Sequence, residues 1–77
     1  MARYYFDIAD DQYSIADTEG ADFSEPEAAK REAIMIATSI ARDLFPSGGG
    51  ARVSVSVREQ QERLFTATVA MEFARTK

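Results

Sequence analysis

Hydrophobic and polar residues alternate at the start of the chain. Across residues 3–8 the period is two and aromatic side chains recur, which is typical of a half-buried strand. Residues 9–12 read Ala-Asp-Asp-Gln and favour a turn, because Asp side chains bond nearby backbone N–H groups. Tyr13 and Ile15 resume the alternation in a short second strand. The pattern predicts Tyr4, Phe6 and Ile8 in the core and Arg3, Tyr5 and Asp7 on the open face of a sheet.

The next segment carries a helix-start signal. Ser24 is a good N-cap, and Glu27 stands three residues later, as a capping box requires. Pro26 falls in the first turn, where its missing N–H costs nothing. We expect the helix to end near Leu44, because Pro46 disfavours helical geometry in the residue before it.

Apolar residues of this helix fall into one main arc and a second stripe. In helical projection the main arc, which should face the sheet, contains Ala29, Ala33, Ile36, Ala37, Ile40 and Leu44. Met35 and Ile34 lie about 100° and about 160° from Ile36, so they cannot share that arc. Ile34, Ala41 and Phe45 form the second stripe. It is either a set of exposed apolar side chains, which is normal, or a surface for self-association.

Two further strands follow a glycine-rich connection. Val53, Val55 and Val57 alternate with polar residues, residues 59–62 form a polar turn, and a long last strand follows. We expect this last strand to present Phe65, Ala67, Val69, Met71 and Phe73 on one face, and Leu64 with Thr66 on the other. The order β-β-α-β-β predicts a single α+β domain over residues 1–77. A right-handed crossover gives a four-stranded antiparallel sheet of order 2-1-3-4, with the helix packed on one face.

Composition narrows the function classes. The 77 residues include no cysteine and no histidine, so the commonest nucleophile, general base and zinc ligands are missing. A sheet with one helix also leaves little room for a pocket. We expect no enzyme activity, no catalytic residues and no cofactor. No apolar run approaches the roughly 20 residues that span a bilayer, and the first residues lack signal-peptide features. We therefore expect a soluble cytoplasmic protein that does not bind membranes.

Charge is distributed unevenly. The net charge of −4 combines −7 in residues 1–29 with +3 in residues 30–77. An acidic chain is a poor candidate for nucleic-acid binding, which needs a dense cationic surface. Such a function would require the arginines of the second half to gather on one face, namely Arg31, Arg42, Arg52, Arg58 and Arg63.

Four aspartates crowd the first hairpin. Asp7, Asp10, Asp11 and Asp17 could surround a hard cation, although their spacing is not that of an EF-hand loop. The alternative is turn chemistry, which we favour, so we expect no metal site. Asp7 remains to be explained, because it lies on a strand face, where we expect it to pair with Arg52 or Arg58.

The opening residues also carry a family resemblance. The run Arg3-Tyr4-Tyr5-Phe6-Asp7-Ile8 resembles the R-Y-F-F-D start of a small family found mainly in alphaproteobacteria and known only as a domain of unknown function. The Asp17-x-x-Gly20 step and the Glu27-Ala28-Ala29 helix start resemble that family too, so the resemblance covers about residues 3–45. It implies no activity. The hairpin-helix layout is distantly similar to HicB-type antitoxins.

These observations favour a small non-enzymatic protein-interaction module, in the form of a homodimer or bound to an unknown protein partner. The alternative is an antitoxin-like or nucleic-acid-associated regulatory protein. The long last strand, as an apolar edge strand, could add a strand from a partner. The residues we expect in an interaction surface are Ile34, Met35, Ala41 and Phe45 on the helix and Arg3, Tyr5 and Asp7 on the sheet.

Overall fold

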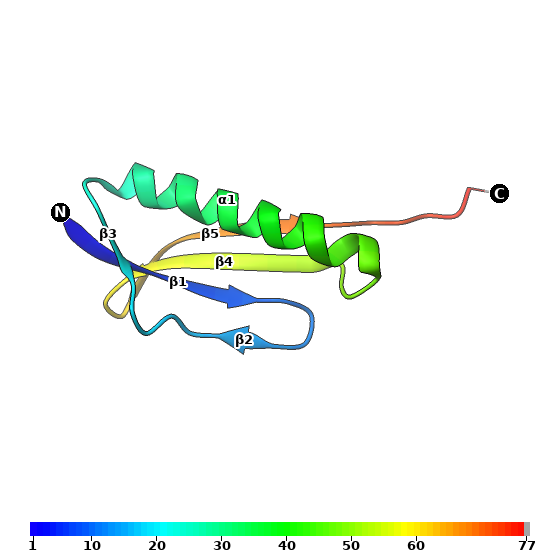
Figure 1. Cartoon of the computed structure of the whole chain (residues 1–77), viewed down its shortest axis with the longest axis horizontal. Coiled ribbons are helices and arrows are strands. Elements are labelled where there is room, and N and C mark those ends of the chain that lie inside the picture. Colours follow the sequence, from blue (N-terminus) through cyan, green and yellow to red (C-terminus); the bar gives the residue numbers. More distant parts are fainter. Residues whose placement is uncertain (77) are drawn as a thin grey trace.

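The computed structural model describes residues 1–76, in which one helix packs against one face of an antiparallel sheet (Figure 1). This confirms the α+β class. Lys77, the last residue of the expected domain, lies outside the described residues. The helical elements are α1 (Pro26–Leu44) and the short 3₁₀ helix η1 (Phe45–Ser47). The strands are β1 (Ala2–Ala9), β2 (Ser14–Ile15), β3 (Ala21–Phe23), β4 (Arg52–Glu59) and β5 (Glu62–Ala70).

The sheet differs in detail from the predicted one. Its main path is β2-β1-β4-β5, and β3 also pairs with β1, so residues 1–76 form five strands rather than four. Antiparallel pairing sets Ile8 opposite Ile15 and Tyr4 opposite Ala21. Between these two pairings, residues 16–20 leave the ladder. The four-strand count was wrong because β3 has three residues, too few to show a period.

The core lies between the central strands and α1. Tyr4 and Phe6 of β1 are buried, and the three valines of β4, Val53, Val55 and Val57, are 0% exposed. The helix meets them with a row of buried alanines: Ala29, Ala33, Ala37 and Ala41. Because alanine has only a methyl group, the helix backbone can lie close to the sheet. Ile36 and Phe23 pack against this core from its margins.

The helix begins one residue later than a Ser24 cap requires. The N-cap is Glu25, which is extended (φ −155°, ψ 156°), and Pro26 is the first helical residue. The prediction of Ser24 as N-cap was therefore wrong. Because proline excludes the helical conformation from the residue before it, Pro26 itself fixes the boundary at Glu25. The predicted end at Leu44 is confirmed.

An irregularity in the last hairpin reverses part of the expected alternation. Val57 lies opposite Phe65, whereas Arg58 lies opposite Arg63, so Leu64 is an extra residue between the two pairs. Such a bulge shifts side chains to the other face. We expected Leu64 on the open face, but it packs against the core. Arg63 lies beside Ser56 and Thr66 on the open face instead.

The close approach of α1 to the sheet generates a first prediction. Replacement of Ala33, which is 1% exposed, by leucine should lower the free energy of unfolding by about 1–3 kcal/mol, because the larger side chain forces helix and sheet apart. Urea denaturation measures this change. The control is Ile34→Leu at the neighbouring position, which is 46% exposed and should change the free energy by less than about 0.5 kcal/mol. Equal effects of the two substitutions would contradict the tight contact at Ala33.

Candidate functional site

The guanidinium of Arg58 joins three segments on the open face of the sheet. Its Nε donates a hydrogen bond to Oδ2 of Asp7 on the neighbouring strand at 2.8 Å. Nη2 donates to the carbonyl of Asp17 at 2.7 Å, and Nη1 to the carbonyl of Gln60 at 2.7 Å. The guanidinium carbon also lies 4.7 Å from the centre of the Tyr5 ring. One side chain of β4 thus holds β1, the segment 16–20 and the β4–β5 turn together.

The carboxylate of Asp17 replaces part of the sheet ladder where residues 16–20 leave it. Its Oδ2 accepts the backbone N–H of Phe6 at 3.0 Å, and its Oδ1 accepts those of Glu19 and Gly20 at 3.0 and 3.2 Å. The N–H of Asp17 donates to Oδ1 of Asp7 at 2.9 Å. Gly20 has φ 73°, and a Cβ there would lie 2.9 Å from the carbonyl oxygen of Tyr4, so glycine fits this position best. We call residues 16–20 the detour; Asp17 and Gly20 fix its path.

Both carboxylates in this network are held in the ionised form. The side chains of Arg58 and Asp7 are 21% and 19% exposed. Burial raises the pKa of Asp7, but the hydrogen bonds from Arg58 and the Asp17 N–H, with the charges of Arg58 and Arg63, outweigh it and leave the pKa below its usual value. The pKa of Asp17 is also lowered, because its three backbone N–H donors and the charge of Arg58 outweigh burial. Carboxylates with lowered pKa values are weak bases, so this network serves the fold better than proton transfer.

The four aspartates of the first hairpin separate into three places. Only Asp7 and Asp17 come together. Oδ1 of Asp10 accepts the N–H groups of Gln12 and Tyr13, which closes the β1–β2 turn. Oδ2 of Asp11 accepts the N–H of Ala51 at 2.8 Å and ties that turn to the start of β4. Within residues 1–76, no three Cys, Asp or Glu side chains gather in a way that could hold a metal ion.

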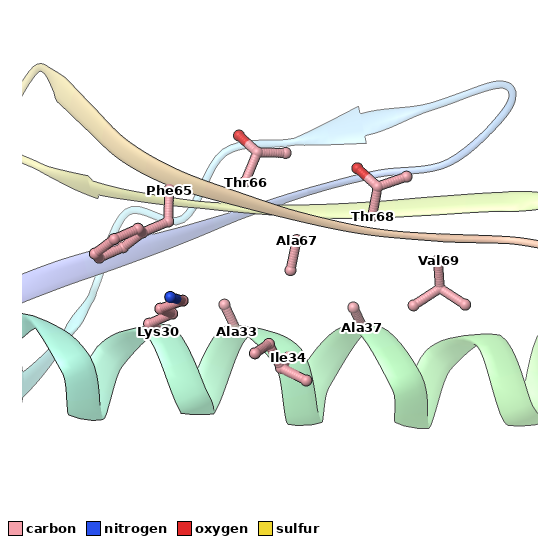
Figure 2. Close-up of a pocket in the computed structure, with 9 residues that line it drawn as sticks. All are labelled: Lys30, Ala33, Ile34, Ala37, Phe65, Thr66, Ala67, Thr68 and Val69. Carbon is pink, nitrogen blue, oxygen red and sulfur yellow. The ribbon is translucent and has the colours of Figure 1, made fainter.

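A groove runs between α1 and the edge strand β5 (Figure 2). Its volume is about 330 Å³. The Nζ atom of Lys30 lies 5.6 Å from the ring centre of Phe65 at one end. In the described part of the chain, β5 pairs with β4 and is last in the sheet order, so its outer edge borders the groove without a further strand. The lining is mostly apolar and consists of Lys30, Ala33, Ile34, Ala37, Phe65, Thr66, Ala67, Thr68 and Val69.

The residues expected in an interaction surface lie in different parts of the fold. On the helix, Ile34 lines the groove, Met35 is 57% exposed outside it, Ala41 is 6% exposed and Phe45 is half-buried. On the open face, Arg3 pairs with Asp22 and donates to the carbonyl of Glu19, while Tyr5 and Asp7 contact Arg58. The last strand, which the sequence marks as an apolar edge strand, forms the other wall of the groove as β5. Its residues were not among those expected in the interaction surface.

The arginines of the second half do not share one face. Arg58 and Arg63 lie on the open face of the sheet, whereas Arg31 and Arg42 belong to α1 on the opposite face. Arg42 also lies 3.8 Å from the carboxylate of Asp43. These four arginines therefore do not form one cationic patch. Among the described residues, no helix combines the length and the apolar character needed to cross a membrane.

The Arg58–Asp7 pair should contribute strongly to stability. Asp7→Ala should lower the free energy of unfolding by about 2–3 kcal/mol, because it leaves the half-buried guanidinium and the Asp17 N–H without their acceptor. The matched control is Asp22→Ala. Asp22 pairs with Arg3, but the two side chains are 48% and 50% exposed, so the loss should stay below about 1 kcal/mol. Similar losses in the two urea titrations would refute the special role of Arg58.

The lowered pKa of Asp17 predicts a pH dependence. The usual value is 3.8, and the native value lies below it, so on acidification the unfolded chain takes up the proton first. The stabilisation is complete above about pH 5 and is lost as the pH falls through the native pKa. Asp17→Asn should be less stable at neutral pH and should lose less stability between about pH 5 and pH 2. Urea midpoints across this range measure the slope, and parallel curves for the variant and the parent chain would contradict the network.

Comparison with known proteins gives one match. No curated protein and no solved structure resembles the chain significantly. The family model described as "Domain of unknown function (DUF6894)" matches residues 3–70, which include Asp7, Asp17 and Arg58 and every strand of the described sheet except the first residue of β1. This span is also longer than the resemblance over residues 3–45 that the opening motif carries. The chain therefore belongs to the DUF6894 family.

Proposed function

We propose that this chain is a small, non-enzymatic cytoplasmic protein that acts through protein contacts as a homodimer. The observation that carries the proposal is the large solvent-accessible surface area of the chain. The accessible area is 5649 Å², whereas a compact monomer of 8.5 kDa exposes about 4,650 Å². The excess of about 1,000 Å² is comparable with the roughly 800 Å² that each partner buries in a standard protein interface.

The dimensions of the chain point in the same direction. The radius of gyration is 13.8 Å, against about 11.5 Å for a compact domain of this length. Residues 71–76 follow β5 as an extended segment that runs past the end of the helix (Figure 1). Two large apolar side chains of this segment are exposed, Met71 at 51% and Phe73 at 95%. Exposed apolar area of this kind favours association, because association removes it from water.

The alternative of an antitoxin-like or nucleic-acid-associated protein receives less support. It requires a cationic face, whereas Arg3 and Arg58 of the sheet each pair with an aspartate. The proposal of a non-enzymatic role draws its support from the same network, since Asp7 and Asp17 are engaged by donors from the fold itself. Protein contact through apolar surface is the function that the geometry supports best.

The proposal predicts a dimer in solution. Sedimentation equilibrium of the whole chain at micromolar concentration should give a mass of about 17 kDa, twice the 8.5 kDa of one chain. Association that buries apolar surface should persist at high salt, since salt screens charges but leaves the hydrophobic effect intact. A mass of 8.5 kDa at all concentrations up to 100 μM or so would overturn the proposal.

A further inference from the structure

We propose that two copies of this chain join through their β5 edges, in antiparallel orientation, so that residues 71–76 of each copy extend beneath α1 of the other. This inference rests on the proposed homodimer and specifies its interface. The occupant of the groove between α1 and β5 is thus a second copy, which contributes Met71 and Phe73. The two sheets become one continuous sheet with both helices on the same face.

The backbone of β5 is suited to this pairing. The N–H of Met71 donates to the carbonyl of Ala51 at 2.8 Å, which places the backbone groups of Met71 on the side of β4. Because these groups alternate along a strand, those of Thr66, Thr68 and Ala70 point to the outer edge. An antiparallel partner can pair with this row of donors and acceptors. The pairing can continue into residues 71–76, which are already extended.

Symmetry and side chains select one register. A two-fold axis perpendicular to the sheet pairs residues of the same face, and an axis at Val69 sets Phe73 opposite Phe65 and Met71 opposite Ala67. These side chains lie on the helix face, where Phe65, Ala67 and Val69 line the groove beside Ile34. An axis at Ala67 would instead set Glu62 opposite Glu72, and like charges directly opposite are unfavourable.

Charges on the two copies are complementary in this register. Arg75 follows Phe73 on the helix face and approaches the first turn of the partner helix, where Glu27 is the acidic residue. The register also sets Arg75 opposite Arg63, but the bulge at Leu64 turns Arg63 to the other face of the sheet. Glu72 lies on the open face opposite Thr66, near Arg63 on that face. Opposite charges in both places favour this orientation, since complementary patches fix the register of an interface.

The helices also fit. Helix α1 packs over β4 and β5, and neighbouring strands are about 4.8 Å apart, so the two helix axes would stand about 9–10 Å apart. This is the usual distance between packed helices. The helix side that lines the groove, with Lys30, Ile34 and Ala37, would face the other helix. Of the second apolar stripe, Ile34 therefore acquires a partner.

Single cysteines test the register, because the chain has none of its own. In the proposed pairing, the Cα atoms of the two Val69 residues are about 4.5 Å apart, within the range of a disulfide, whereas those of the two Thr68 residues are about 8 Å apart. On oxidation, Val69→Cys should form disulfide-linked dimers that Thr68→Cys does not. Efficient linkage through Thr68→Cys with none through Val69→Cys would overturn the register.

A pair of helix variants tests the surface itself. Ile34 and Met35 are adjacent, exposed and apolar, but of the two only Ile34 lines the groove. In sedimentation equilibrium, Ile34→Asp should weaken dimerisation about tenfold or more, while Met35→Asp should leave it unchanged. Far-UV circular dichroism checks that both variants remain folded. A wild-type monomer overturns both this interface and the proposed homodimer. A dimer that tolerates Ile34→Asp and fails to link through Val69→Cys overturns this interface alone.

Discussion

The contact between Arg58 and Asp7 is the interaction on which the rest of this small fold depends. The pair joins the two central strands on the face opposite the helix. The same guanidinium binds the carbonyls of Asp17 and Gln60, so the first hairpin, the detour at residues 16–20 and the last turn meet at one side chain. This chain has no disulfides and few large buried side chains. On this face of the sheet, charged hydrogen bonds hold the segments in place.

The opposite face of the sheet is held by apolar packing against the helix. Four buried alanines let α1 lie close to the valines of β4, and this contact uses short side chains. A core of this kind is narrow, because alanine and valine bury little area each. Larger apolar side chains such as Ile34, Phe65 and Phe73 remain at its margin or beyond it. The small core and the apolar groove at β5 thus have a common origin in the choice of alanine for the buried helix positions.

The open face and the groove contribute differently to function. On the open face and in the β1–β2 turn, the acids that could have carried chemistry accept hydrogen bonds from the fold itself: Asp7, Asp10, Asp11 and Asp17. At the groove, Phe65 and Ala67 pack against the core from its margin, whereas Ile34 is exposed. The outer edge of β5 carries no further strand among the described residues. The residues matched by the DUF6894 family model include both the open face and the groove, and the family has no assigned function.

The sequence by itself determined the elements with a clear period, β1, α1, β4 and β5, and the end of the helix before Pro46. Local pattern suffices there, because each element has eight or more residues and is long enough to show its period. The predicted sheet order agrees with the main path β2-β1-β4-β5 but lacks β3. Tertiary structure decided the rest. Strand β3 exists because Asp17 and Gly20 rebuild the ladder around the detour, and Leu64 turns inward because a bulge interrupts β5. The choice of Arg58 over Arg52 for Asp7 also depends on strand register, which long-range pairing sets and the spacing of residues does not reveal.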